Sequence, residues 1–105
     1  MIRHVVMWKL KDHAEGADRA ANLVKMQTLL ASCVGLVPGM LQFATAVATP
    51  GLEATYDIIL DSTFASRAAL DAYQTHSHHV AMKPFIGAIR AERQCMDYEV
   101  PDSLR

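Results

Sequence analysis

The stretch Ile2-Arg-His-Val-Val-Met-Trp-Lys-Leu10 decides the fold of this chain. It is rich in the β-branched and aromatic residues that favour strands. Apolar side chains occupy both odd and even positions until the charged end of the stretch, which is typical of a central strand that is buried on both faces. The sequence therefore predicts a strand over residues 2–10 in the middle of a sheet.

Helix and strand signals alternate from this strand onward. Residues 11–17 are predicted to form a polar turn region, and Asp18 is a suitable N-cap for a helix that runs to about Ser32. A break rich in glycine and proline follows. Residues 41–49 then alternate between apolar and small or polar types before a Pro-Gly turn, which predicts a second strand.

The second half of the chain continues the alternation. Residues 56–64 read as a third strand, and Ser66 is a suitable cap for the next helix. Residues 80–89 suit a short helix that Pro84 would kink or restart, and residues 90–100 finish as a strand. The order β-α-β-β-α-(α)-β predicts an α+β, ferredoxin-like split βαβ fold: a four-stranded antiparallel sheet with helices on one face.

The other face of this sheet also carries apolar groups. On the first strand, Val5 and Met7 lie opposite the face that bears His4, Val6 and Trp8. One small layer of helices cannot cover both faces, so we expect the second face to pack against another copy in a homodimer, as a dimeric α/β barrel. The residues expected on this dimer face are Val5, Met7, Ile58, Leu60, Met96 and Tyr98.

Composition limits the classes of function. The chain has 105 residues, of which 51% are hydrophobic, and this fits one domain over residues 1–105. A net charge of −1 without a basic run argues against a nucleic-acid partner. No stretch reaches the roughly 20 apolar residues of a membrane span, and no secretory signal is recognisable. Because Cys33 and Cys95 have no CxxC spacing, a reducing, cytoplasmic location is expected.

The segment Tyr73-Gln-Thr-His-Ser-His-His-Val80 is the best candidate for chemistry. It holds three of the five histidines beside a tyrosine, at the junction between two helical patterns. Imidazole exchanges protons near neutral pH, and a phenol beside it can donate or accept a hydrogen bond. If the protein is an enzyme, this segment is where we expect its active site.

Four motifs together resemble a known family. They are the opening His4-Val-Val-Met-Trp-Lys-Leu-Lys11, the strand end Ser62-Thr-Phe64, the segment Tyr73-x-x-His76-x-x-His79-Val80 and the closing Asp97-Tyr98. In this order they resemble the stress-responsive dimeric A/B barrel (Dabb) domain family. The resemblance implies a dimer whose two sheets enclose a barrel, and a pocket in each subunit between sheet and helices. Functions in the family differ widely and include a plant polyketide (olivetolic acid) cyclase.

The resemblance also implies roles for individual residues. Tyr73 and His79 match the residues that act on the substrate in that cyclase, and His4 matches its first-strand histidine. His79 would then remove an acidic proton next to a carbonyl while Tyr73 bonds the developing enolate oxygen. Aligned in the same way, Arg93 would face the pocket and could hold a carboxylate. The ligand-binding residues expected in addition to these catalytic candidates are Trp8, Asp57, His76, Met82 and Arg93.

Simpler explanations exist for the same residues. His4 can be a structural histidine, and Tyr73 can pack its ring in the core. His76 and His78 can cap helix ends. The three clustered histidines lack the companion ligands of a recognised metal site, and there is no nucleotide-binding or hydrolase motif, so no metal and no cofactor are expected.

Three functions remain open. The first is a homodimeric barrel-domain protein that binds a small organic molecule. The second is a cofactor-independent cyclase, isomerase or lyase that uses His79 and Tyr73, and the third is a structural or assembly protein without a ligand. A space between sheet and helices filled by Trp8, Met82 and Phe85 would favour assembly, whereas an open cavity lined by His4, Tyr73 and His79 would favour a ligand.

Overall fold

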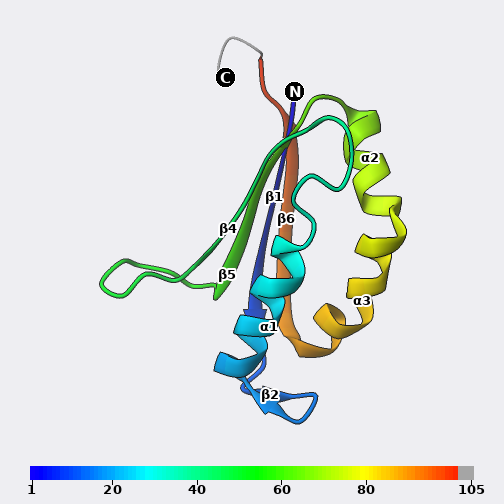
Figure 1. Ribbon diagram of the computed structural model, residues 1–105. Helices are drawn as coiled ribbons and strands as arrows, with labels where there is room; N and C mark the ends of the chain where they lie inside the picture. The colour runs from blue at the N-terminus through cyan, green and yellow to red at the C-terminus, as the bar shows by residue number, and fades with distance from the viewer. Residues whose placement is uncertain (102–105) are drawn as a thin grey trace.

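The computed structural model describes residues 1–101 and contains a four-stranded antiparallel sheet (Figure 1). Its order is β4-β5-β1-β6, so the strand over residues 2–10 is central, as predicted. The fold is therefore the predicted α+β, ferredoxin-like arrangement. The bounds of the strands are β1 Ile2–Leu10, β4 Met40–Val47, β5 Ile58–Phe64 and β6 Arg90–Glu99.

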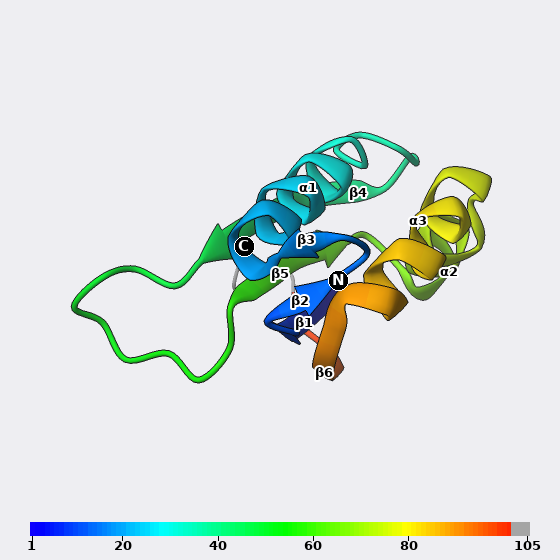
Figure 2. The same ribbon diagram turned by 90° about the horizontal axis from the view of Figure 1, so that it is seen from below.

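Three helices cover one face of the sheet (Figure 2): α1 Arg19–Ala31, α2 Arg67–Thr75 and α3 Ser77–Ile89. The predicted N-caps of the first two are confirmed, because Asp18 accepts a hydrogen bond from the Ala21 amide and Ser66 accepts one from the Ala69 amide. In the part of the chain that the structure describes, no helix is both long and apolar enough to cross a membrane.

The third helix differs from its prediction. It begins at Ser77 rather than Val80, because the His76 side chain accepts a hydrogen bond from the His78 amide and caps the first turn. Pro84 lies inside the helix and does not end it. Consequently His78 and His79 lie in the first turn of α3, and the helix fixes the direction of their side chains.

A small hairpin stands where a polar turn region was predicted. β2 (His13–Ala14) pairs with β3 (Ala17–Asp18), and Glu15 and Gly16 both have positive φ at its turn. The buried Asn22 side chain of α1 donates to the Ala14 carbonyl at 2.9 Å. This bond attaches the hairpin to the helix.

The core lies between the helices and the inner face of the sheet. Cross-strand pairs share a face, and β1 pairs Val6 with Leu60 and Trp8 with Ile58. Leu60 and Ile58 are buried under the helices, so their predicted place on the dimer face was wrong. The strand pattern had separated the two faces of β5 correctly, but it could not show which face the helices cover.

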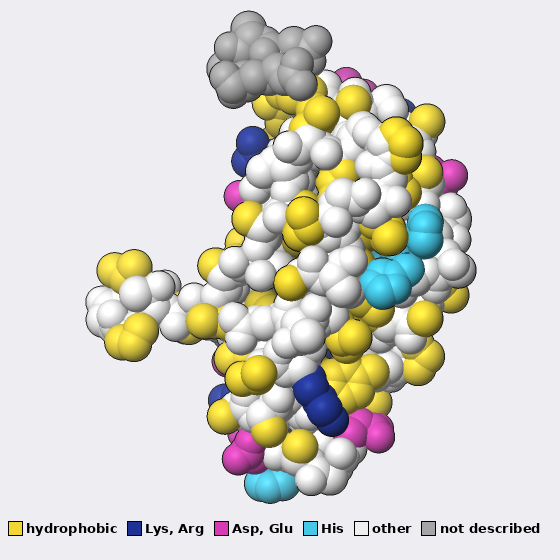
Figure 3. Space-filling model, viewed as in Figure 1, with side chains coloured by type: hydrophobic (Ala, Val, Ile, Leu, Met, Phe, Trp, Pro, Cys, Tyr) yellow, Lys and Arg dark blue, Asp and Glu magenta, His cyan; other side chains and the backbone are white. Residues whose placement is uncertain are grey.

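No helix within residues 1–101 lies on the outer face of the sheet. Pairing places Ile59 opposite Met7 and Met96 opposite Val5 on this face, with Tyr98 further along β6. Met96 is 66% exposed. The loop of residues 48–57 projects from the body beside this face and carries hydrophobic side chains at its tip (Figures 1 and 3). We call this surface the outer face, defined by Val5, Met7, Ile59, Met96 and Tyr98.

Candidate functional site

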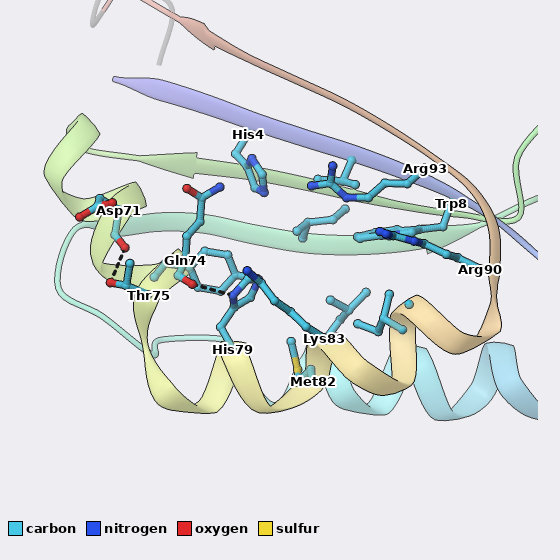
Figure 4. Close-up of a pocket in the computed structure, with 16 residues that line it drawn as sticks. His4, Trp8, Asp71, Gln74, Thr75, His79, Met82, Lys83, Arg90 and Arg93 are labelled. Carbon is cyan, nitrogen blue, oxygen red and sulfur yellow. Dashed lines mark hydrogen bonds between the residues drawn. The ribbon is translucent and has the colours of Figure 1, made fainter. Parts of the chain in front are cut away.

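A cavity of about 560 Å³ lies between the inner face of the sheet and the helices α2 and α3 (Figure 4). The sheet contributes His4, Trp8 and Arg93 to its lining, and the helices contribute Tyr73, His79 and Met82. Six of the residues predicted for the site are therefore brought together, and His79 projects from α3 toward the strand that carries His4 (Figure 4).

His79 is held in one tautomer. Its Nδ1–H donates to the Gln74 carbonyl at 3.0 Å, which leaves the Nε2 lone pair free of that bond. Burial lowers the pKa of His79 most strongly. The hydrogen bond to Gln74 raises this pKa, whereas the charges of Lys83, His4 and Arg93 lower it further. At neutral pH His79 is therefore a neutral imidazole that can accept a proton.

Tyr73 stands against His79. Its ring centroid lies 4.6 Å from that of His79, and the residue is only 1% exposed. Burial raises the pKa of the phenol, and the neighbouring Cys33 raises it further through charge and a hydrogen bond. Tyr73 therefore keeps its proton and can serve as a hydrogen-bond donor. Its ring also packs against Phe64 and Phe43, so the simpler core role is fulfilled at the same time.

His4 forms a dyad with a carboxylate. Its Nδ1 lies 2.5 Å from Oδ1 of Asp97 across the β1–β6 pair. Because a carboxylate accepts, Nδ1 carries the proton and Asp97 fixes the orientation of the ring, which is 3% exposed. Ser62 donates to the His4 carbonyl at 2.7 Å and supports the backbone beneath it.

Two predicted ligand-binding residues do not line the cavity. His76 serves as the cap of α3. Asp57 lies at the start of β5, where its carboxylate accepts from the Leu10 amide at 2.7 Å and its own amide donates to the Trp8 carbonyl at 2.9 Å. Both side chains therefore have local structural partners, and their assignment to the site is corrected.

Several further residues of the site were not predicted from the sequence. Gln74, Lys83 and Arg90 line the cavity, and Asp97 orients His4. Lys83 could have been found from its spacing, because it follows His79 by four residues and therefore lies on the same side of a helix. Asp97 required the register of β1 against β6, which no local pattern reveals.

One group of side chains has the composition of a metal site. The ligand atoms of His4, Cys95 and Asp97 lie within 4.8 Å of one another. A structural zinc site normally has four ligands, and here His4 Nδ1 and Asp97 are already joined by a hydrogen bond. The group is better explained as the support of His4 than as a metal centre.

The fold and the cavity together define a class of protein. It is an α+β protein with a ferredoxin-like sheet, helices on one face and a side-chain-lined pocket between them. The chain belongs to the stress-responsive A/B barrel domain family, whose model matches residues 2–100. The comparison with curated proteins gave no match.

Solved structures share this fold. A dimeric ferredoxin-like protein of unknown function from Bacteroides fragilis NCTC 9343 has a TM-score of 0.78 and 23% identity over 94% of this chain and 95% of that one. A dimeric ferredoxin-like protein of unknown function from Thermobifida fusca has a TM-score of 0.81 and 19% identity over 94% and 90%. A protein from Arabidopsis thaliana has a TM-score of 0.71 and 25% identity over 97% of each chain.

Proposed function

We propose that this protein binds a small, mostly apolar organic molecule in the cavity between its sheet and the helices α2 and α3. The observation that carries the proposal is the open cavity that His4, Tyr73 and His79 line together, rather than a space filled by side chains. Trp8 and Met82 form parts of its wall, and Phe85 borders a separate surface groove. A cavity of this size with a few convergent polar groups is typical of small-molecule sites.

The binding unit in this proposal is a homodimer formed through the outer face. Two of the similar structures are described as dimeric. The outer face is apolar at Val5, Met7, Ile59 and Met96, and no helix of the described residues covers it. Met7 and Ile59 also share a surface hollow with Leu52 of the projecting loop, so the loop would extend the same interface.

A ligand screen by NMR tests this function. Histidine ring signals would be followed in the wild type and in His79→Ala while aromatic acids and β-keto acids are added. We expect a subset of compounds to shift the His79 and His4 signals, because both rings line the cavity. If no compound of the panel shifts the ring signals of His79 or His4 while the dimer stays stable, the proposal is overturned and the assembly function is favoured.

A second candidate function is catalysis on a carbonyl compound without a cofactor. Two neighbouring residues favour this function: a neutral His79, whose Nε2 can take a proton, and a protonated Tyr73. The centroids of their rings lie 4.6 Å apart. His79 would remove the proton next to the carbonyl, and Tyr73 would donate a hydrogen bond to the enolate oxygen. The match to the cyclase at these two positions supports the same assignment.

Turnover of the compounds that bind would test the second function. We expect His79→Ala to abolish the reaction and Tyr73→Phe to slow it by about 10²-fold, since loss of one donor to a developing oxyanion has effects of this order. Equal rates in the wild type and both variants would exclude this mechanism while leaving ligand binding intact.

A further inference from the structure

One buried donor at the cavity lacks an acceptor. Trp8 is the only tryptophan of the chain, and it lines the cavity while being 5% exposed. Its indole nitrogen is buried, and no acceptor among residues 1–101 reaches it. Leaving a buried N–H without a partner costs free energy, so such groups in native proteins usually have a partner in the functional state.

Two arginines lie at the Trp8 end of the cavity, and the Lys83 side chain reaches toward His79 instead (Figure 4). Arg93 is the cross-strand partner of Trp8 on the inner face, and Lys83 and Arg90 come from α3 and its C-terminal end. None of the three forms an ion pair with a carboxylate of the described residues. Asp71 is the one acidic residue that lines the described cavity, and it lies at the far end from Trp8 and Arg90 (Figure 4).

We propose that the ligand is an organic carboxylate, and that Trp8, Arg93 and Arg90 hold its carboxylate group at the mouth of the cavity. This inference rests on the proposed binding function and specifies the chemical class of the ligand. The polar side chains at this end, Trp8, Arg90 and Arg93, are all donors, so the complementary group is an acceptor, and a carboxylate is a strong acceptor of matching charge. Arginine can also bind it through two parallel hydrogen bonds.

The exposure of these residues explains why the charge can be bound at low cost. Arg93 and Arg90 are exposed, whereas Trp8 lies just inside. A carboxylate between them stays partly hydrated and still reaches the indole N–H, so the penalty for burying an ion is small. The apolar part of the ligand can then enter between Val6, Leu60 and Ile86.

This arrangement orients the ligand toward the histidines. Trp8 and His4 are four residues apart on β1, which corresponds to roughly 13 Å at about 3.3 Å per residue. A carboxylate at Trp8 therefore places the opposite part of an extended ligand near His4 and His79. If the protein is catalytic, the reacting carbonyl would be remote from the carboxylate that anchors the molecule.

A matched pair of compounds tests the inference: 4-phenylbutyrate and its neutral amide, 4-phenylbutanamide. Both would be titrated into the ¹⁵N-labelled wild type, with the single indole N–H signal reporting on Trp8 and the ring signals of His79 reporting on occupancy of the cavity. We expect the acid to bind at least about tenfold more tightly than the amide and to shift the indole signal downfield. Raising the salt concentration should weaken the binding of the acid and leave the binding of the amide unchanged.

Variants then separate the subsite from the rest of the cavity. Arg93→Gln should weaken binding of the acid about tenfold and leave binding of the amide unchanged, and Arg90→Gln should act in the same direction with a smaller effect. Arg67→Gln is the matched control, because Arg67 is an exposed arginine of α2 that pairs with Glu99 and does not line the cavity. Trp8→Phe should remove the indole signal, and it should weaken the binding of the acid more than the binding of the amide.

The outcomes distinguish this inference from the proposed function. If both compounds shift the His79 signals with equal affinity and Arg93→Gln changes neither, the cavity binds ligands but the carboxylate subsite is wrong. An acid that binds without moving the indole signal and without loss in Arg93→Gln overturns the subsite as well. If neither compound moves the His79 or Trp8 signals, the inference fails for these ligands together with its premise.

Discussion

At the scale of single residues, hydrogen bonds decide which nitrogen of each histidine faces the cavity. His79 and His4 both have Nδ1 engaged, the first with the Gln74 carbonyl and the second with Asp97. In each case Nε2 is the atom that remains for a ligand. The histidine that looked equivalent in sequence, His76, uses its Nδ1 as a helix cap instead.

The lowered pKa of His79 should make stability depend on pH. When the pH falls below the ordinary value of 6.5, the unfolded chain takes up the proton before the folded protein does. The free energy of unfolding should therefore decrease from pH 7.5 toward the lowered pKa, and this decrease should be smaller in His79→Gln. Urea unfolding at several pH values measures it. His13→Gln, in the exposed β2 strand, is the control, and an equal slope in the wild type and His79→Gln would contradict the prediction.

The Asp97 carboxylate should determine the tautomer of His4. Asp97→Ala removes the acceptor that holds the proton on Nδ1, so the population with the proton on Nε2 should rise. The ¹⁵N shifts of the His4 ring report this directly. Asp61→Ala removes a carboxylate from the other face of the sheet and should leave the ring signals unchanged. Unaltered His4 shifts in Asp97→Ala would show that the carboxylate does not set the tautomer.

At the scale of elements, the entry to β4 fixes how closely the sheet approaches α2. Gly39 has φ +86, and a Cβ built there would lie 2.8 Å from the Cβ of Ala69 in α2. Its carbonyl also accepts from the Ala65 amide at 2.8 Å, so the backbone cannot easily move away. A glycine is therefore required here both by conformation and by space.

Gly39→Ala should destabilise the protein by about 3 kcal/mol, as the sum of a positive-φ cost and overpacking. Gly51→Ala is the matched control, because Gly51 has φ +88 with nothing within 4 Å of a built Cβ. It should cost only about 1 to 2 kcal/mol. Urea unfolding of both variants isolates the contact with Ala69. If both variants lose the same free energy of unfolding, α2 can move away from the added Cβ at Gly39 without destabilising the protein.

At the scale of the whole molecule, one face of the sheet holds the cavity and the other is available for a partner. The inner face of β1 bears His4 and Trp8, while its outer face bears Val5 and Met7. The proposed dimer would thus leave the mouth of the cavity, at Arg90 and Arg93, on the opposite side of the sheet from the interface. Assembly and ligand binding should be separable by mutation.

Met96→Glu should convert the proposed dimer to a monomer at micromolar concentration. Met96 lies on the outer face opposite Val5, and burying an unpaired carboxylate there would cost several kcal/mol. Size-exclusion chromatography with light scattering should give the mass of one 11.6 kDa chain for the variant and twice that mass for the wild type. Val24→Glu, on the exposed side of α1, should remain dimeric. A monomeric wild type would refute the dimer itself.

The order of the four long strands and the helices, the caps at Asp18 and Ser66 and the separation of the two faces of each strand could be predicted from the sequence, whereas the β2–β3 hairpin could not. The predicted features follow from local periodicity and backbone hydrogen bonding, which depend on near neighbours. The sequence also pointed to Tyr73 and His79 as candidates at the junction between two helical patterns, and they lie in α2 and α3.

The face of β5 that the helices cover, and the set of polar residues that meet at the cavity, depend on the tertiary structure. Asp97 joins His4, and Arg93 joins Trp8, because of the register of β1 against β6. Lys83 lines the same cavity because α3 begins at Ser77 and packs along the sheet. Register and packing depend on contacts between residues far apart in the chain, so no local pattern contains them.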